Sequence, residues 1–160
     1  MRFCCPLLVV ENIGVSREFY ENILGQKVKY DFGENVVYEG DFSIHEKAHF
    51  SLVSHIKPDG ILQGSNNCEL YFEENNLIGF LDKLHRSADI VFVHSIEQQP
   101  WGQRVVRFYD PDGHMIEVGE TMEAVAKRFL ADGLSILETA KRISMPTEFV
   151  SQCKTTPQTL

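Results

Sequence analysis

One order of predicted elements occurs twice along this chain, and it limits the possible folds more than any other feature. Residues 3–10 predict a strand, and Asn12 can cap a helix that should stop at Gly25. Short runs typical of strands complete the first half, at residues 26–32, 35–40 and 48–55. The first half therefore predicts the order β-α-β-β-β.

The second half repeats this order. A predicted strand at residues 68–74 precedes a helix whose apolar residues keep i, i+3, i+4, i+7 spacing, and three strands follow at residues 90–98, 103–109 and 114–119. Each half, of roughly 55 to 60 residues, is too small to bury its own sheet face. We therefore predict an α+β fold in which two paired βαβββ modules, at about 1–56 and 67–120, form a curved mixed sheet around a cavity.

Residues 121–160 predict a helical C-terminal appendage. Gly133 can close a first helix, Ser135 and Glu138 have the spacing of a capping box, and Pro146 permits a third short helix. The stretch GLSILETAKRISMPTEFV resembles a helix-turn-helix, with Ala140 at the customary small position and Ser144 where a turn glycine is usual. Five Lys or Arg against four acids leave the appendage nearly neutral, which favours packing against the sheets or dimerisation over DNA binding.

Charge and composition exclude several classes of function. The formal net charge of -8 argues against general binding to nucleic acid or to anionic membranes, which needs clustered Lys and Arg. No apolar run approaches the length of a membrane span, and the start, MRFCCPLLVV, is interpreted as a strand and not a signal peptide. The four cysteines lack CxxC spacing and are expected to be reduced, so we expect a cytoplasmic protein.

A single acid, Glu117, interrupts the last predicted apolar strand. Asp110 to Gly113 offer the Asp, Pro and Gly of a tight turn, so this strand follows a hairpin, and His114 is expected to be an exposed turn residue. Because side chains alternate along a strand, Glu117 points away from Ile116 and Val118. It therefore faces either solvent or a cavity.

Two segments carry a resemblance to a known family. LLVVENIGVSREFYENILGQKV and PWGQRVVRFYDPDGHMIEVGE resemble the opening and closing segments of the vicinal oxygen chelate superfamily, which contains glyoxalase I, bleomycin-resistance proteins and extradiol dioxygenases. The resemblance covers residues 3 to 120 and implies the fold predicted above, and it implies a homodimer. It says less about chemistry, because this fold supports binders and several enzyme classes.

The resemblance also implies positions for metal ligands. In metal-using relatives these are usually His or Glu, and the corresponding positions here are Cys5, Glu69 and Glu117, with His49 as a nearby candidate. Thiolate favours softer metals and carboxylate favours harder ones, so the set is poorly matched. We therefore expect no metal or other cofactor, with a divalent ion held by these four residues as the alternative.

These residues have other possible roles. Cys5 is either a small buried hydrophobic residue or a thiolate, and a carboxylate nearby would raise the thiol's pKa. Glu69 and Glu117, if they face each other, could act as an acid and a base without a metal, or simply bind water or a cationic ligand.

Aromatic residues complete the candidate site. Trp101, the one tryptophan, could stack on a flat or cationic ligand, or fill the end of a sheet or a dimer interface. Three further aromatic residues either line the same cavity or pack in the core, namely Phe50, Tyr71 and Phe108.

Two functions of different class follow. The first is a metal-free protein that binds and sequesters a small aromatic or cationic molecule between Trp101 and the inward acids. The second is a metal-dependent lyase, isomerase or dioxygenase, similar to lactoylglutathione lyase, in which a divalent ion stabilises an enolate. Whether the chain is an enzyme stays open. A third hypothesis makes the C-terminal helices a regulatory reader of a ligand sensed by the sheets, and the acidic net charge counts against it.

Overall fold

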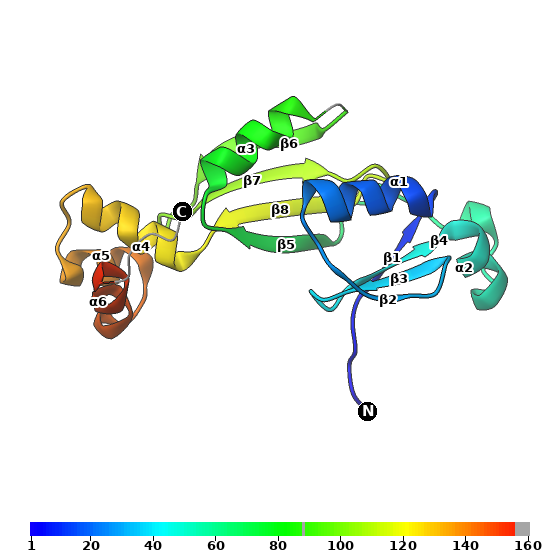
Figure 1. Cartoon of the computed structure of the whole chain (residues 1–160), viewed down its shortest axis with the longest axis horizontal. Helices are drawn as coiled ribbons and strands as arrows, with labels where there is room; N and C mark the ends of the chain where they lie inside the picture. The colour runs from blue at the N-terminus through cyan, green and yellow to red at the C-terminus, as the bar shows by residue number, and fades with distance from the viewer. Residues whose placement is uncertain (88, 156–160) are drawn as a thin grey trace. The chain divides into compact units, whose positions relative to one another are not determined.

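A computed structural model describes residues 1–87 and 89–155. It contains two four-stranded mixed sheets and a group of C-terminal helices (Figure 1), so the predicted α+β class and the repeated order of elements are confirmed in outline. The chain divides into two compact units. Unit 1 comprises Met1–Leu70, Leu84–Val91 and Tyr109–Met115, and unit 2 comprises Tyr71–Lys83, Phe92–Phe108 and the chain from Ile116 onward.

The first sheet has the strand order β1-β4-β3-β2. Its strands are β1 (Leu7–Val10), β2 (Val28–Asp31), β3 (Asn35–Tyr38) and β4 (Ser43–Glu46). β1 and β4 are parallel, with Leu7 opposite Ser43, and β3 is antiparallel to both of its neighbours. Val10, Val36 and Ile44 are fully buried, so the apolar residues of three strands form one core face.

The first predicted helix begins and ends at the expected residues, and it changes from an α-helix to a π-helix along its length. The Asn12 side chain accepts hydrogen bonds from the N–H groups of Gly14 and Val15, and Gly25 has a φ of 66°, which suits a residue that ends a helix. Between them α1 (Ile13–Arg17) continues as a π-helix, η1 (Glu18–Ile23). Ser16, Phe19 and Tyr20 form the buried face of this helix, whereas Val15 is 51% exposed.

The predicted strand at residues 48–55 is wrong, because these residues form helix α2 (Lys47–Ser54). The fourth strand lies earlier, at Ser43–Glu46. β1 ends at Val10 opposite Glu46, and β3 begins at Asn35 opposite His45. Residues after Glu46 thus have no neighbouring strand to pair with, and a helix satisfies their N–H and C=O groups internally. β1 is likewise shorter than predicted, since its partner spans only four residues.

The second sheet has the strand order β5-β8-β7-β6. Its strands are β5 (Glu69–Glu74), β6 (Val91–Gln98), β7 (Arg104–Tyr109) and β8 (Met115–Glu120), and the helix after β5 is α3 (Leu77–Arg86). Phe108 of β7 is fully buried, with ring centroids 6.2 Å from both Phe80 of α3 and Phe92 of β6. α3 therefore covers the face of the sheet to which Phe108 points, and the neighbouring residue Arg107 points to the opposite face.

The turn between β7 and β8 forms as predicted, but His114 is not an exposed turn residue. The Gly113 N–H donates to the Asp110 carbonyl at 3.0 Å and closes the turn. The side chain of His114 is only 20% exposed, and its Nδ1 lies 2.8 Å from Asp110 Oδ2. The Asp110 carboxylate, which is fully buried, also accepts hydrogen bonds from the Tyr20 hydroxyl and from two backbone N–H groups of the turn.

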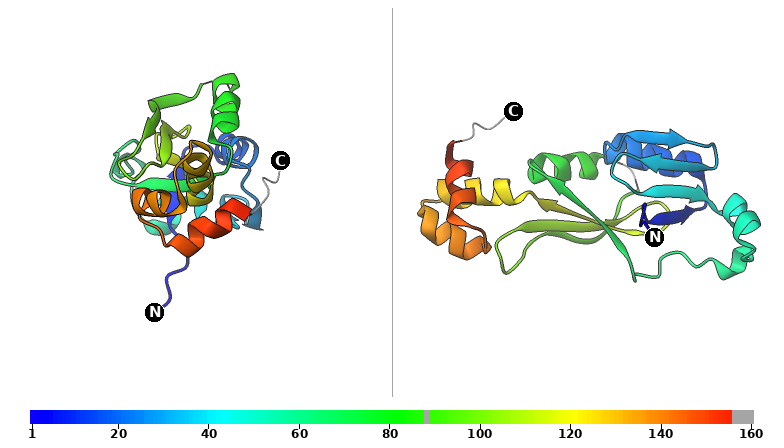
Figure 2. Two further views of the ribbon diagram at one scale, coloured as in Figure 1. Left: turned by 90° about the vertical axis from the view of Figure 1, so that its left-hand side faces the viewer. Right: turned by 90° about the horizontal axis from the view of Figure 1, so that it is seen from below.

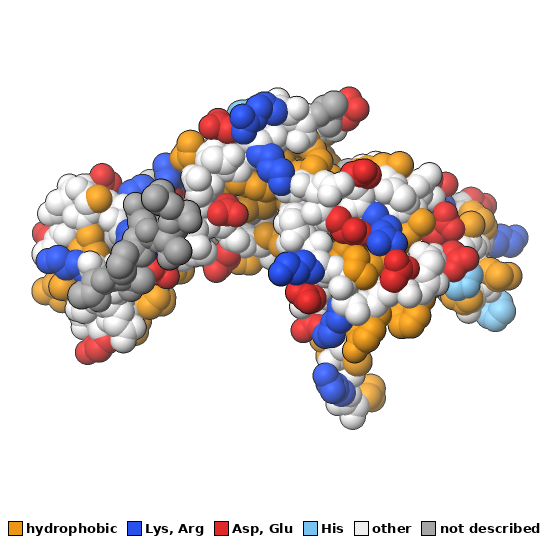
Figure 3. Space-filling model, in the orientation of Figure 1, with side chains coloured by type: hydrophobic (Ala, Val, Ile, Leu, Met, Phe, Trp, Pro, Cys, Tyr) orange, Lys and Arg blue, Asp and Glu red, His pale blue; other side chains and the backbone are white. Residues whose placement is uncertain are grey.

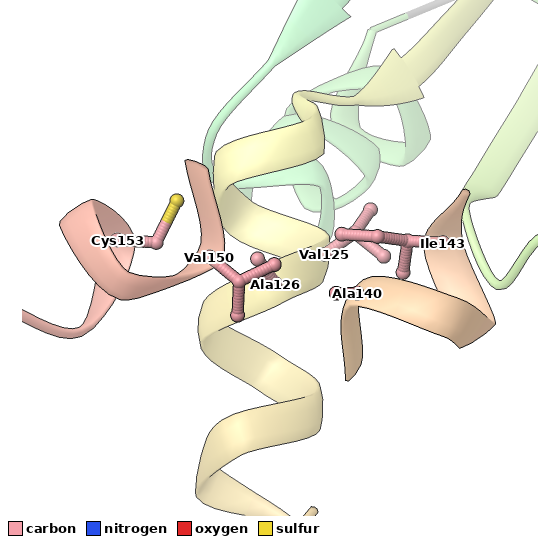
Figure 4. Close-up of a cluster of buried hydrophobic side chains, with 6 residues drawn as sticks. All are labelled: Val125, Ala126, Ala140, Ile143, Val150 and Cys153. Atoms are coloured by element: carbon pink, nitrogen blue, oxygen red, sulfur yellow. The ribbon is translucent and has the colours of Figure 1, made fainter. Parts of the chain in front are cut away.

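The C-terminal helices pack around a small core of their own (Figures 2 and 4). They are α4 (Met122–Ala131), α5 (Ile136–Ile143) and α6 (Thr147–Thr155), and a short helix of Pro58–Gly60 (η2) completes the elements described. The capping box of Ser135 and Glu138 is present as predicted. Ala140 is buried, and Ser144 adopts the left-handed conformation (φ 56°) at the position where a helix-turn-helix usually has glycine.

The surface of these helices carries both signs of charge. Lys127 pairs with Glu123 at 2.7 Å, and the carboxylate of Glu138 is engaged in the capping box. Lys and Arg side chains are interspersed with Asp and Glu over the visible face of the chain (Figure 3). Among residues 1–87 and 89–155, no helix is long and apolar enough to cross a membrane.

Candidate ligand-binding site

Glu117 lies on β8 and forms an ion pair with Arg107 of the neighbouring strand β7. Glu117 is 8% exposed, and it points away from the core residues Ile116 and Val118, as the alternation predicts. Arg107 also contacts His94 of β6, with Nη1 3.2 Å from His94 Nε2, while His94 Nδ1 lies 2.6 Å from the carbonyl of Ser95. A carboxylate, a guanidinium and an imidazole thus connect three adjacent strands.

Two exposed aromatic residues lie along the same sheet. Tyr71 of β5 is 47% exposed, and Trp101, in the turn before β7, is 44% exposed. The buried side chain of Gln103 joins them, because its Oε1 accepts from Trp101 Nε1 at 3.0 Å and its Nε2 donates to the Tyr71 hydroxyl at 2.8 Å. Both rings are therefore held by hydrogen bonds at one edge while their faces remain available for stacking.

Gly119 places Tyr71 and Gln103 on the face of the sheet that carries Glu117. A Cβ atom at Gly119 would lie 2.9 Å from Gln103 Nε2 and 3.2 Å from the Tyr71 hydroxyl. The missing side chain of Gly119 thus leaves the room that Tyr71 and Gln103 occupy. Because Gly119 and Glu117 are two residues apart on β8, their side-chain positions share a face. We call Tyr71, Trp101, Gln103, Arg107 and Glu117 the aromatic-acid site.

A second acid borders the site. The Tyr71 hydroxyl donates to Glu73 Oε1 at 3.0 Å, and Glu73 is exposed two residues further along β5. Burial raises the pKa of Tyr71, Glu73 raises it further and Gln103 opposes the shift, with the net direction upward. The hydroxyl therefore stays protonated as a donor, and the site presents an exposed carboxylate beside the Tyr71 ring.

Three further predicted site residues are Phe108, Glu69 and Cys5. Phe108 packs in the core against α3, on the opposite face of the sheet from Arg107. Glu69, the first residue of β5, is exposed and lies two residues before Tyr71, so their side chains share one face of the strand. Cys5 precedes β1 and is partly buried, with Sγ 3.8 Å from the hydroxyl of Ser43. The Cys5 thiol therefore contacts a buried serine of the first sheet.

His49 and Phe50 lie on helix α2, in the segment for which a strand was predicted. His49 Nδ1 is 2.8 Å from His45 Nε2, and the ring of Phe50 meets His45 edge to face with centroids 5.6 Å apart. Burial lowers the pKa of His45, and the neighbouring charge of His49 lowers it further. The two imidazoles thus form a hydrogen-bonded pair at the end of β4.

The residues that the superfamily resemblance assigns to a metal do not fit that role here. The Glu117 carboxylate already contacts the Arg107 guanidinium, whose positive charge competes directly with a cation for the same oxygens. No group of three or more His, Cys, Asp or Glu side chains arranged to hold a metal ion occurs among residues 1–87 and 89–155. The donor set also mixes a thiol with carboxylates.

The sequence analysis missed Arg107, Gln103 and Glu73. Arg107 could have been noticed, because it interrupts the apolar run RVVRFY as Glu117 interrupts MIEVG. Its partner could not be identified, since the pairing depends on the register between β7 and β8. Gln103 gives no sequence signal, because its role depends on Trp101 and Tyr71, which are 2 and 32 residues away along the chain.

Comparisons with known proteins agree with this architecture. A family model described as a glyoxalase-like domain matches residues 3–123. A solved structure of a protein of unknown function from Agrobacterium tumefaciens str. C58 is similar at 39% sequence identity, with a TM-score of 0.66, over 76% of this chain and 94% of that chain. No curated protein matches.

A second similar structure comes from a glyoxalase/bleomycin resistance protein/dioxygenase of Nocardioides, at 19% identity and a TM-score of 0.58, over 75% of this chain and 83% of that chain. A hypothetical protein from S. aureus is similar at 20% identity and a TM-score of 0.62, over 76% of this chain and 94% of that chain. These two likenesses concern the fold. The family model covers most of the chain and shows that the chain belongs to the glyoxalase-like domain family, in agreement with the resemblance to the vicinal oxygen chelate superfamily.

Proposed function

We propose that this chain is a metal-free protein that binds a small, flat and positively charged aromatic molecule at the aromatic-acid site. The observation that carries the proposal is the ion pair of Glu117 with Arg107 on the face that also holds Tyr71 and Gln103, to which Trp101 donates a hydrogen bond. An acid engaged in this way is poorly suited to a metal ion. Exposed aromatic rings beside it are suited to a stacked ligand.

The charge of the ligand follows from the surroundings of the rings. Each aromatic ring presents a negative face, so it attracts a cation placed above it. The exposed carboxylate of Glu73 lies next to Tyr71 and adds to this attraction, whereas Glu117 is largely neutralised by Arg107. A flat cation therefore gains from both rings and from Glu73, and an anion of the same shape is disfavoured by Glu73.

The unique tryptophan provides a direct test of binding. Titration of the protein with a panel of aromatic cations, and with neutral and anionic molecules of the same shape, should quench Trp101 fluorescence with the cations bound most tightly. Removing one stacking ring costs about 1 kcal/mol. Tyr71→Ala and Trp101→Ala, the latter followed by calorimetry, are thus each expected to weaken binding about five- to tenfold.

A matched control is available in the first sheet. Tyr30 of β2 is 55% exposed, comparable with Tyr71, but it stacks on Phe32 and lies in unit 1. Tyr30→Ala should leave binding unchanged. Equal affinity of wild-type protein, Tyr71→Ala and Trp101→Ala for every compound of the panel would contradict the proposal.

The alternative is a metal-dependent lyase, isomerase or dioxygenase, and membership of the superfamily keeps it in view. Elemental analysis of protein purified without chelator separates the two. One zinc, iron, manganese or nickel ion per chain that disappears in Glu117→Ala would favour the enzyme and overturn the metal-free binder. A homodimer, which the superfamily resemblance implies, is part of the same proposal and is tested by sedimentation.

A further inference from the structure

The turn that carries Trp101 contacts the C-terminal helix α4. Residues 99–103 close on themselves, with the Gln99 N–H donating to the Gln103 carbonyl at 2.7 Å and the Gly102 N–H donating to the Gln99 carbonyl at 2.8 Å. Gly102, in the middle of this turn, is buried although its neighbour Trp101 is exposed. The inner side of the turn is therefore covered, and the residues that cover it come from α4.

Phe129 of α4 occupies the space beside Gly102. A Cβ atom on Gly102 would lie 2.5 and 2.7 Å from two carbons of the Phe129 ring, closer than real Cβ contacts. Gly102 also has a φ of 94°, a conformation that favours glycine. The path of the turn and the position of this ring thus fit each other, and glycine is required at residue 102 for both reasons.

Arg128 fixes the turn by hydrogen bonds. Its Nη2 donates to the Gly102 carbonyl at 2.7 Å and to Glu120 Oε2 at 2.8 Å, and its guanidinium lies 4.8 Å from the Phe129 ring centroid. The carbonyl of Glu120 in turn accepts from Gln103 Nε2 at 2.7 Å. Arg128 therefore connects α4 directly to Gly102, which follows Trp101, and through Glu120 to Gln103.

We propose that Arg128 and Phe129 are positioning residues for the aromatic-acid site, so that helix α4 sets the orientation in which Trp101 and Gln103 meet a ligand. The ligand-binding part of this inference rests on the proposed function; the positioning of Trp101 does not. It assigns a role to the C-terminal appendage, whose first helix is a supporting wall of the site and not a separate reader. The charge of Arg128 acts through the backbone of Gly102, without touching the ligand.

The test compares Arg128→Met with Lys127→Met, its neighbour on the same helix. Lys127 pairs with Glu123 on the helix surface, so the control removes a cation and keeps the turn contacts. In ligand-free protein, Arg128→Met should shift Trp101 emission to longer wavelength and raise its quenching by acrylamide, because the turn loosens. Affinity for the aromatic cations should fall about tenfold, because the charged hydrogen bond that holds the Gly102 carbonyl is lost. Lys127→Met should match wild type in each measurement.

Phe129→Leu provides a second route if Arg128→Met folds poorly. It retains an apolar side chain in the core of the helices but removes the ring beside Gly102, so the same change in Trp101 emission is expected. Wild-type emission and quenching in both variants would overturn the inference. If wild-type protein binds none of the cations but Arg128→Met still alters Trp101 emission, the proposed function fails while the positioning role stands.

Discussion

Replacing Asp110 by asparagine is expected to lower the free energy of unfolding by about 3 kcal/mol. Its carboxylate is fully buried and accepts from the Tyr20 hydroxyl at 2.8 Å, from His114 Nδ1 at 2.8 Å and from the N–H groups of Asp112 and His114. Burial, and then the charge and hydrogen bond of Asp110, raise the pKa of Tyr20 well above its usual value, so the hydroxyl remains a donor. An amide would turn its own N–H₂ toward one of these donors.

The effect of Asp110→Asn should depend on pH through His114. Burial alone lowers the pKa of His114, but the hydrogen bond and charge of Asp110 outweigh it, so the folded-state pKa is raised. Stabilisation by protonated His114 is then fully present below the unfolded pKa of about 6.5 and is lost as pH rises through the folded pKa. Urea unfolding at a series of pH values should show the largest difference between wild type and Asp110→Asn in acid, shrinking towards alkaline pH.

Tyr20→Phe serves as the control for this pH dependence. It removes one hydrogen bond to Asp110 and should cost about 1 kcal/mol, but it keeps the contact of Asp110 with His114. The difference in unfolding free energy between Tyr20→Phe and wild type should therefore be constant across pH. A difference between Asp110→Asn and wild type that does not vary with pH would show that His114 is not held protonated by Asp110.

The order of elements was predictable because it depends on local rules. Alternating residues predicted β5 to β8, the Asp110–Gly113 turn followed from its composition, and Ser135 with Glu138 predicted the start of α5. The strand predicted in the region of residues 47–54 was wrong. Whether these residues form a strand or a helix depends on where β1 ends, which is 37 residues earlier in the chain. The four residues of β4 were missed because three successive side chains are buried, so apolar and polar residues do not alternate along the strand.

The candidate site was predictable only in part. Tyr71 and Glu117 could be chosen from residue type and strand parity, and Trp101 from residue type; the structure places the first two on strands of one sheet and Trp101 in the turn before its strand β7. Phe108 was chosen on the same grounds of residue type. It follows Arg107 directly on β7, so its side chain points to the opposite face of the sheet and packs in the core. Arg107, the partner that decides how Glu117 behaves, could not be assigned without the cross-strand register. The position of a residue along a strand predicts which face of the sheet its side chain is on. Identifying the side chain that it contacts requires the three-dimensional structure.

Glu120→Gln is expected to cost about 3 kcal/mol of unfolding free energy, since it leaves two arginines without their carboxylate. Glu120 is 2% exposed and accepts from the backbone N–H and Nε of Arg104 at 3.0 and 2.9 Å, and from Arg128 Nη2 at 2.8 Å. Burial raises the pKa of Glu120, but the hydrogen bonds from Arg128 and Arg104 outweigh it and hold the pKa below its usual value. The carboxylate therefore remains charged in the folded protein at neutral pH.

The pH dependence of this variant should have the opposite sign to that of Asp110→Asn. A depressed carboxyl pKa gives stability that is present above the unfolded pKa, about 4.3, and is lost as pH falls through the folded pKa. The advantage of wild type over Glu120→Gln should thus be constant near neutral pH and shrink in acid, as measured by urea unfolding. Glu123→Gln, which removes the exposed partner of Lys127 on the same unit, should cost no more than about 0.5 kcal/mol. Equal costs for the two variants would mean that burial does not strengthen the Glu120 network, and that α4 is held to the second sheet by Phe129 and its apolar neighbours alone.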